Sequence, residues 1–221
     1  MMILLWTGLA HASSVVAWSF ETGPEEFTTS SGLQFEWGPF SEPTPPTEAD
    51  CCGWATRLAG DYLNDADDTL TFPIFTIDPS HRNLLILEHW YVIEDGPEAD
   101  AGWVEAQHAG GWVRLDPVYG YPASGGFSGI SDGWQIDAFD LSGLGSNPTL
   151  RLQFSSGDRV SYSGWFIDAM QVASGDPVPP LIVDVDEPMN TADIDGPYVI
   201  EARAFDDLTY PTLTLIWSAD G

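Results

Sequence analysis

Short apolar runs, each bounded by glycine, proline, aspartate or serine, are the feature of this 221-residue chain that most restricts its fold. Several of these runs alternate with a period of two, and helical periodicity is absent from every window of about eleven residues or more. Regularly spaced short strands separated by turn residues are typical of antiparallel sandwiches. We therefore predict an all-β fold, an antiparallel jelly-roll β-sandwich. Its strands are expected at Val15–Phe20, Thr69–Ile77, Leu84–Ile93, Trp103–Gln107, Gly111–Leu115, Trp134–Phe139, Thr149–Ser155 and Trp165–Val172.

A proline-rich segment, Gly175–Pro180, predicts a linker after this sandwich, which we place at residues 13–174. Three further strand-like runs follow the linker, separated by acidic turns. Three strands do not close a sandwich, so we expect residues 181–221 to be a truncated immunoglobulin-like domain and the chain to be a fragment of a longer protein. The three runs are Leu181–Asp186, Tyr198–Phe205 and Thr212–Ser218.

The amino end, residues 1–12, has the pattern of a secretory signal peptide. A short apolar run stops at Ala10-His11-Ala12, where small residues flank one arbitrary residue, which predicts cleavage after Ala12. The alternative is an ordinary buried first strand. The run is too short to cross a bilayer, which takes roughly 20 apolar residues. We expect a secreted protein, extracellular or at a cell surface, without membrane insertion.

Charge and aromatic content restrict the partners. The chain has 34 acidic and 6 basic residues, a net charge of −28, which repels nucleic acid and anionic membranes. Its 10 Trp, 11 Phe and 7 Tyr supply the apolar area for a folded core, which disordered chains lack. The acidity then has three explanations: a high-salt habitat, solubility in secretion, or loops that bind hard cations.

The two cysteines are adjacent, Cys51 and Cys52. Neighbouring residues on a strand point to opposite faces, so we expect no disulfide between them, and the chain has no other cysteine. The common sequence patterns of metal and redox sites have wider spacing, such as CxxC, and further ligands. The sequence thus favours one buried and one exposed thiol.

A series of motifs between Trp18 and Val172 resembles the MAM-like jelly-roll domains of immune inhibitor A and bacillopeptidase F-type secreted bacterial proteins. The resemblance implies the same jelly-roll fold, and it implies that the trailing segment is one of the immunoglobulin-like repeats that commonly follow such modules. The motifs that carry it are Gly53-Trp54-Ala55-Thr56, Gly60-Asp61-Tyr62, Phe72-Pro73-Ile74, Glu88-His89-Trp90-Tyr91, Asp100-x-Gly102-x-Val104-Glu105, Gly110-Gly111 and Gly164-Trp165-Phe166-Ile167-Asp168.

No catalytic constellation is recognisable in the sequence. A zinc peptidase would need HExxH, and a serine hydrolase would need GxSxG between a strand and a helix; the chain has neither pattern. His89, beside Trp90, is interpreted as a structural histidine of the sheet rather than a ligand or base. We therefore predict no catalytic residues.

Calcium is the cofactor that the acidic residues favour. Ca²⁺ takes six to eight oxygen ligands, often from closely spaced aspartates, and Asp61–Asp68 is rich in them. Glu21 follows the first strand and Asp168 lies in the last, and these strands can be neighbours in a jelly roll. We expect a structural calcium site among Glu21, Asp61, Asp65 and Asp168; the alternative is solvated acidic loops.

The aromatic residues fall into two groups that differ in their sequence surroundings. Tyr119, Tyr121 and Trp134 lie in or beside the glycine-rich stretch Tyr119–Gly133, so they are candidates for a sugar-binding platform. The tryptophans in apolar strand contexts are expected to fill the space between two sheets. They are Trp54, Trp90, Trp103, Trp112 and Trp165.

Together these features predict a non-catalytic extracellular binding or adhesion module of a larger protein, with a glycan or a protein as its partner. The alternative is an accessory domain of a secreted peptidase or other hydrolase whose catalytic domain lies outside this sequence. A signal peptide directly before the sandwich favours the first interpretation.

Overall fold

The computed structural model describes residues 3–5, 13–30, 35–45, 51–96, 100–175, 181–185, 202–205 and 214–216. All regular secondary structure in these ranges is β-strand, which confirms the predicted all-β class. None of the described segments forms an apolar helix of membrane-spanning length. The chain divides into two units, Ser13–Gly175 and a second one made of Met1–Ala12 with Asp176–Gly221.

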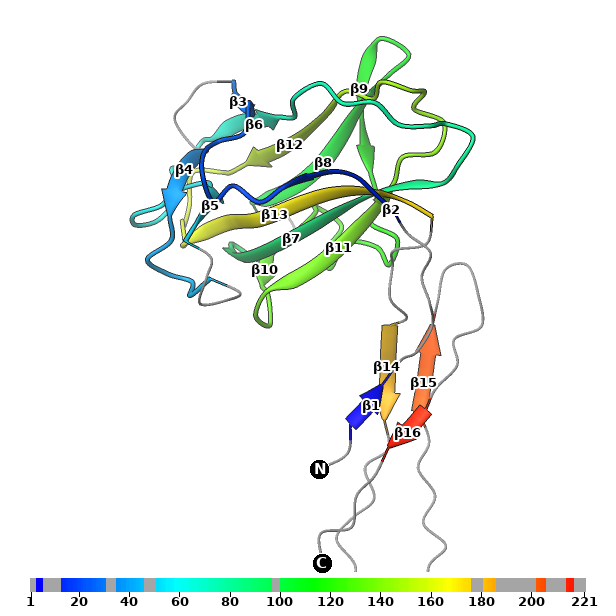
Figure 1. The fold of residues 1–221 in the computed structure, drawn as a ribbon. Helices are drawn as coiled ribbons and strands as arrows, with labels where there is room; N and C mark the ends of the chain where they lie inside the picture. Colours follow the sequence, from blue (N-terminus) through cyan, green and yellow to red (C-terminus); the bar gives the residue numbers. More distant parts are fainter. Residues whose placement is uncertain are drawn as a thin grey trace, which may run out of the picture. The chain divides into compact units, whose positions relative to one another are not determined.

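The unit Ser13–Gly175 is a sandwich of two sheets (Figure 1). The larger sheet has seven strands: β2 (Ser13–Trp18), β4 (Glu36–Pro39), β5 (Cys52–Ala55), β7 (Asn83–Ile93), β10 (Gly129–Ile130), β11 (Gln135–Asp140) and β13 (Gly164–Ser174). The smaller has five: β3 (Thr28–Thr29), β6 (Asp67–Thr71), β8 (Ala101–His108), β9 (Gly111–Leu115) and β12 (Leu150–Ser155).

Strand pairing is antiparallel throughout both sheets, which confirms the predicted antiparallel sandwich. The order is β10-β7-β13-β5-β4 in the seven-stranded sheet, with β11 also on β7 and β2 also on β13. The five-stranded order is β3-β6-β12-β8-β9. β6, β7 and β8 each lie in the opposite sheet from the strand before them, and so do β12 and β13. Such crossings are the chain path of a double-sheet jelly roll.

The core lies between the sheets and follows from the alternation of side chains along each strand. In β7, Leu85, Leu87 and Ile93 point inward, and they belong to one buried cluster with Leu152 and Phe154 of β12. Each such side chain contributes about 1.5–3 kcal/mol when fully buried. Aromatic rings of the same cluster pack edge to face. The Trp18 ring centroid lies 5.4 Å from that of Phe27, 5.6 Å from that of Phe72 and 5.6 Å from that of Phe75.

The strand predicted at Thr69–Ile77 is shorter in the structure, because β6 ends at Thr71. Phe72 still donates its backbone N–H to the carbonyl of Leu150 at 3.1 Å. Pro73 then has no N–H to give, so the ladder cannot continue through it. The short strands β3, β4, β5 and β10 were not predicted, since two to four residues carry too little periodicity to be recognised.

The second unit contains two pairs of antiparallel strands in its described residues. β14 (Leu181–Val185) pairs with β15 (Ala202–Phe205), and β1 (Ile3–Leu5) pairs with β16 (Thr214–Ile216). A strand at Ile3–Leu5 corresponds to the alternative interpretation of the amino end. Removal of residues 1–12 as a signal peptide stays a prediction, as does the immunoglobulin-like identity, and the remaining residues of 1–12 and of the linker after Gly175 lie outside the described ranges.

Candidate functional site

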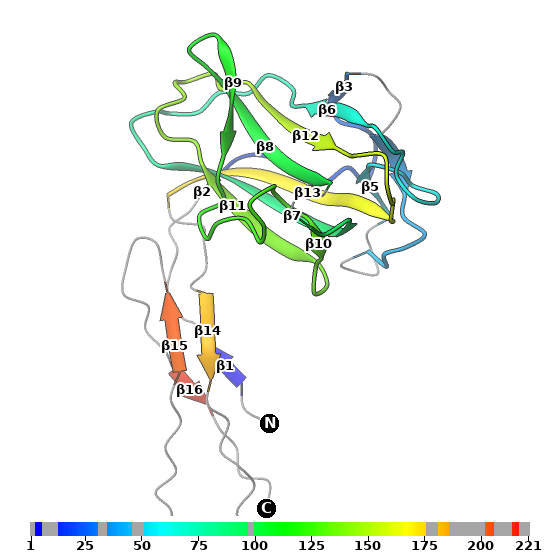
Figure 2. The same ribbon diagram turned by 180° about the vertical axis from the view of Figure 1, so that it is seen from behind.

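Five planar or charged side chains lie together on the outer face of the five-stranded sheet. Trp103 and Glu105 come from β8, Trp112 and Arg114 from β9, and Arg151 from β12. The register pairs Glu105 with Arg114 on one side and with Arg151 on the other, so the three share one face. The residues between them, such as Val104, point into the core. We call this set the Trp–Arg face; its strands are seen in Figure 2.

Glu105 is the centre of the Trp–Arg face. Its Oε1 accepts a hydrogen bond from the Trp103 indole N–H at 2.9 Å, and its Oε2 accepts one from Arg151 Nε at 2.6 Å. The glutamate side chain is 13% exposed, so this ion pair is shielded from water and stronger than a surface pair. The carboxylate therefore holds one tryptophan and one arginine in fixed orientations.

Both arginines of the face stack on aromatic rings. The Arg151 guanidinium carbon lies 4.2 Å from the Trp112 ring centroid. That of Arg114 lies 4.1 Å from the Tyr121 ring centroid and 5.7 Å from that of Trp103, and its Nη1 donates to the Gly125 carbonyl at 2.8 Å. Cation–π contacts of this kind contribute about 0.5–2 kcal/mol each. The result is an ordered row of alternating rings and charges, at the end of which Trp112 is 37% exposed.

The prediction that all five strand tryptophans are core residues is right for two of them. Trp165 and Trp54 are buried between the sheets. Trp103 and Trp112 lie on the Trp–Arg face, and Trp90 packs on a separate cluster with Phe166. The alternation along β8 already indicates the outward position of Trp103, because Trp103 and Glu105 are two residues apart and share a face, whereas Val104 points to the opposite face.

The structure does not bring Tyr119, Tyr121 and Trp134 together as a platform. Tyr121 packs into the core, its ring centroid 4.8 Å from that of Phe127, and its hydroxyl bridges two strands by accepting from Val104 N–H and donating to the Leu115 carbonyl. Burial raises the pKa of the Tyr121 phenol to about 12. Trp134 packs against Phe40 and donates its indole N–H to the Thr44 carbonyl at 2.8 Å. Tyr119 is exposed.

Cys51 and Cys52 form a disulfide, so the prediction of two separate thiols is wrong. The argument from strand alternation fails because β5 begins only at Cys52, and Cys51 belongs to the preceding segment. Cys51 donates its N–H to Glu21 Oε2 at 2.8 Å and its carbonyl accepts from Phe40 N–H at 3.0 Å. Cys51 is exposed and Cys52 is buried, as predicted.

Two of the predicted calcium ligands border the same break in the seven-stranded sheet. One edge of β13 pairs with β5 up to Ile167 and with β2 from Met170 onward, and the buried Asp168 lies in between, at a β-bulge. Glu21 follows β2 and contacts Cys51, just before β5. Its Oε1 is buried and makes no hydrogen bond within the described part of the chain. Glu21 and Asp168 therefore both border the place where this edge of β13 changes its partner from β5 to β2.

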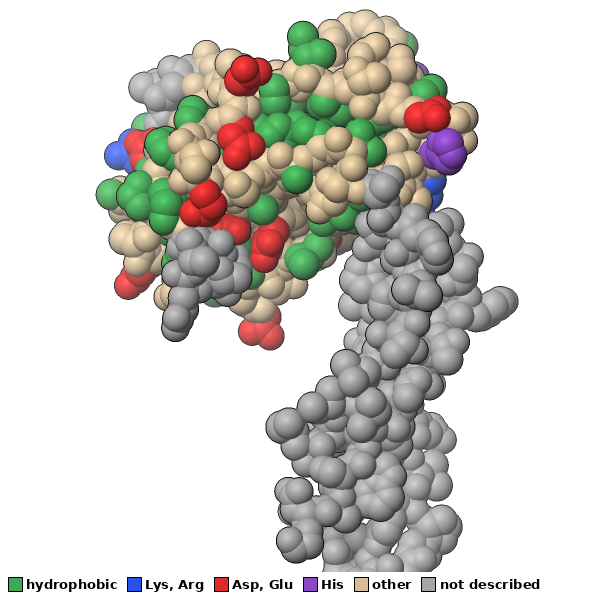
Figure 3. Space-filling view, viewed as in Figure 1, with side chains coloured by type: hydrophobic (Ala, Val, Ile, Leu, Met, Phe, Trp, Pro, Cys, Tyr) green, Lys and Arg blue, Asp and Glu red, His purple; other side chains and the backbone are tan. Residues whose placement is uncertain are grey.

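The other predicted ligands lie elsewhere. Asp61 and Asp65 are exposed in the connection from β5 to β6, where Asp65 donates its N–H to the Gly157 carbonyl at 2.7 Å. Asp67 is occupied by a 2.6 Å hydrogen bond from Gln153. In the described ranges, the one set of three His, Cys, Asp or Glu ligand atoms within 4.8 Å of one another is Glu21 with the two cysteines, so the four-residue site is not assembled. On the face seen in Figure 3, acidic side chains lie among apolar and neutral ones.

His89 lies buried in β7, in agreement with its predicted place in the sheet. It is fully buried, its Nε2 lies 2.9 Å from Asp137 Oδ2, and its Nδ1 lies 2.9 Å from the indole nitrogen of Trp165. An indole nitrogen only donates, so Nδ1 must accept and Nε2 carries the proton that reaches Asp137. This chain of hydrogen bonds ties β13, β7 and β11 together.

Comparison with known proteins does not assign the chain to a group. No protein-family model matches the sequence, and no curated protein matches it either.

Proposed function

We propose that the unit Ser13–Gly175 is a non-catalytic extracellular binding module whose ligand is a neutral glycan, bound on the Trp–Arg face. The observation that carries the proposal is the row of Trp103, Glu105, Arg151 and Trp112, in which an exposed indole stands beside ordered charged groups. A sugar ring presents C–H groups that stack on an indole and hydroxyls that bond to a carboxylate or guanidinium. The Trp–Arg face offers both.

Preorganisation supports binding at this face. Rotamer-rich side chains cost about 0.5–1.5 kcal/mol each when they are immobilised on binding. Arg151 and Glu105 are held by the hydrogen bond between them, Arg114 by its hydrogen bond to the Gly125 carbonyl, and both arginines by stacking, so most of this cost is met during folding.

Charge favours a neutral ligand. The net charge of −28 repels anionic polysaccharides at long range, and the positive charge of Arg151 is already neutralised by Glu105. A neutral glycan meets no such repulsion. Catalysis has no part in this proposal, because stacking and hydrogen bonding suffice to retain a polysaccharide.

Affinity electrophoresis in gels containing xylan, mannan, β-glucan or starch, with a pull-down on cellulose, tests the proposal. We expect retardation by at least one of these polymers, and loss of it in Trp112→Ala, whose ring is exposed and whose removal leaves the core intact. Tyr119→Ala serves as the matched control on the exposed loop and should be retarded like the parent. No retention on any polymer, or retention unchanged by Trp112→Ala, would falsify the proposal.

We further propose that calcium stabilises the sandwich at Glu21 and Asp168. The buried Glu21 Oε1 lacks a hydrogen bond in the described structure, and a hard cation would supply its missing partner. Bound there, the ion would link the end of β2 to β13 and so secure the amino end of the unit. Calcium at 100 times its dissociation constant would add about 2.7 kcal/mol to the free energy of unfolding.

Thermal unfolding with excess Ca²⁺ and with chelator measures this contribution. We expect the Tm to rise by roughly 5–10 °C with calcium. Asp168→Asn should remove the shift, whereas Asp65→Asn, at an exposed aspartate of the β5–β6 connection, should keep it. An unchanged Tm in the parent, or a shift that survives Asp168→Asn, would refute calcium binding at this place.

The MAM-like identity of the unit, and its secretion, belong to the same proposal. The antiparallel sandwich agrees with the expected fold, and several motif glycines lie where a side chain would meet the core, such as Gly53 beside Phe40 and Gly102 beneath Trp165. A glycan-binding module of this kind is equally compatible with a longer hydrolase, which it would direct to its polymer.

A further inference from the structure

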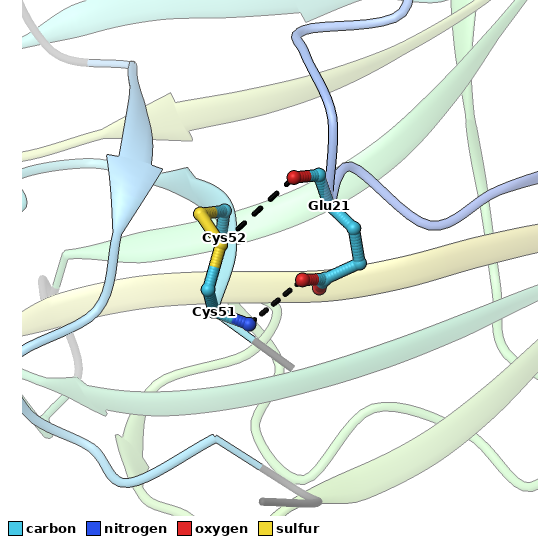
Figure 4. A group of neighbouring side chains, drawn as sticks. All are labelled: Glu21, Cys51 and Cys52. Atoms are coloured by element: carbon cyan, nitrogen blue, oxygen red, sulfur yellow. Dashed lines mark hydrogen bonds between the residues drawn. A yellow bond between two sulfur atoms is a disulfide. The ribbon is translucent and has the colours of Figure 1, made fainter. Parts of the chain in front are cut away.

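The Cys51–Cys52 disulfide lies against Glu21 at the break between β2 and β5 (Figure 4). One ligand atom from each residue, two sulfurs and a carboxylate oxygen, lies within 4.8 Å of the others. Cys51 is at the surface and its sulfur is 3.9 Å from the Glu21 carbonyl oxygen. The group is therefore reachable from solvent while Cys52 and Glu21 Oε1 are buried.

The backbone around the two cysteines is fixed independently of the disulfide. Cys51 is anchored by its N–H to Glu21 and by its carbonyl to Phe40, and Cys52 pairs with Pro39 in the β4–β5 ladder. Breaking the sulfur–sulfur bond leaves these anchors in place. The two thiols would then remain beside the carboxylate of Glu21.

We propose that reduction of Cys51–Cys52 by a small-molecule thiol opens a binding site for a thiophilic divalent cation such as Zn²⁺ or Cd²⁺, with two thiolates and the Glu21 carboxylate as ligands. In the reduction, two molecules of the external thiol are oxidised to their disulfide, and Cys51 and Cys52 become thiols. The cation then displaces the two thiol protons to solvent and forms two metal–sulfur bonds. In the oxidised protein neither sulfur is a thiolate, so the site is closed.

The chemistry of the donor set selects the cation. Thiolates favour soft and borderline metals, and Zn²⁺ binds sulfur at about 2.3 Å and carboxylate oxygen at about 2.0–2.2 Å. With bonds of this length, any two ligand atoms on one Zn²⁺ lie less than 4.8 Å apart. The two sulfurs and the Glu21 carboxylate oxygen already lie within 4.8 Å of one another. Three protein ligands leave the fourth tetrahedral position to water. The negative charge of the protein raises the local concentration of cations.

Cadmium is the probe that reads this site directly, because its thiolate bonds give an ultraviolet charge-transfer absorption and the chain has only two cysteines. We would titrate CdCl₂ into the full chain, after thiol reduction and desalting without air, and into the oxidised protein. We expect a saturable absorption with one Cd²⁺ per reduced chain and none in the oxidised chain. Absence of the band in reduced protein overturns the proposal.

Variants separate this site from the calcium pair. Cys51→Ser should abolish the band, and Glu21→Gln should weaken Cd²⁺ binding about tenfold or more, a loss of at least about 1.4 kcal/mol. Asp168→Asn should leave Cd²⁺ binding unchanged while it removes the calcium shift. A band that survives Cys51→Ser, or equal affinity in Glu21→Gln, contradicts the ligand set. Protection of the reduced wild-type cysteines from maleimide by Cd²⁺ gives a readout that needs no variant, and failure to protect also overturns it.

Discussion

Tyr62 shows how a buried carboxylate is accommodated in an acidic protein. Its hydroxyl donates to Asp100 Oδ2 at 2.6 Å and accepts from Glu94 N–H at 3.1 Å, while Asp100 Oδ1 accepts from Gly157 N–H at 2.6 Å. Asp100 is 2% exposed, so both of its oxygens depend on these donors. Burial, with the hydrogen bond to Asp100, raises the pKa of Tyr62 well above its ordinary value.

Replacing Tyr62 by phenylalanine should therefore destabilise the sandwich. The change keeps the ring but removes the donor to Asp100, and hydrogen bonds to charged groups contribute about 1.5–3 kcal/mol. We expect that loss in the free energy of urea unfolding. Tyr162→Phe, at an exposed tyrosine of the neighbouring loop, should change it by less than about 0.5 kcal/mol. Similar values for the two variants would contradict the role given to the Tyr62 hydroxyl.

The buried phenol of Tyr121 should make the free energy of unfolding depend on pH under alkaline conditions. Burial raises its pKa to about 12, against about 10 for an unfolded tyrosine. A raised folded-state pKa gives stability that is complete below about pH 10 and is lost as the pH rises toward about 12. The difference corresponds to roughly 2–3 kcal/mol. Urea unfolding between about pH 8 and pH 12 should show this decline, and Tyr121→Phe should make it shallower. If Tyr119→Phe, at the exposed tyrosine, flattened the curve equally, Tyr121 would not be its source.

At the scale of a strand, Gly102 determines how closely β8 approaches β13. A Cβ at this position would lie 2.4 Å from one atom of the fully buried Trp165 ring and 2.6 Å from another. Gly102→Ala should therefore cost about 1–3 kcal/mol through overpacking. Gly111→Ala in β9 is the matched control, because a Cβ there meets nothing within 4 Å, and it should be neutral within about 0.5 kcal/mol. Urea unfolding measures both, and equal costs would contradict the packing argument.

The long strands could be predicted from the sequence because their alternation spans enough residues to be recognised, as in β7 and β13. The Trp–Arg face could have been predicted from the same alternation, since Trp103 and Glu105 are two residues apart on β8 and therefore lie on one face. The contacts of Glu21 were not, because they join a loop after β2 to a residue before β5 and leave no local pattern. The disulfide was missed for a related reason: the start of β5 at Cys52 depends on tertiary pairing with β4.

For the whole molecule, the large excess of acid should make stability depend on salt. Ion pairs between arginine and acid in the described residues include Arg57–Glu36, Arg82–Asp140 and Arg151–Glu105. The 6 basic residues of the chain are far outnumbered by its 34 acidic ones. Their mutual repulsion opposes the compact state. Raising NaCl from about 0.01 M to about 1 M shortens the Debye length from about 30 Å to about 3 Å and screens this repulsion.

We expect the Tm to rise continuously over that range of NaCl, in the parent and in Asp168→Asn alike, because screening acts on the summed charge and not on one site. Calcium at matched ionic strength should add a further, saturable increase in the parent alone. A Tm that is flat or falls with NaCl would show that repulsion is already relieved in the fold. Equal increases of the Tm with CaCl₂ and NaCl at the same ionic strength would mean that calcium acts only by screening. The two titrations therefore distinguish a stabilising effect on the summed charge from specific binding at Glu21 and Asp168.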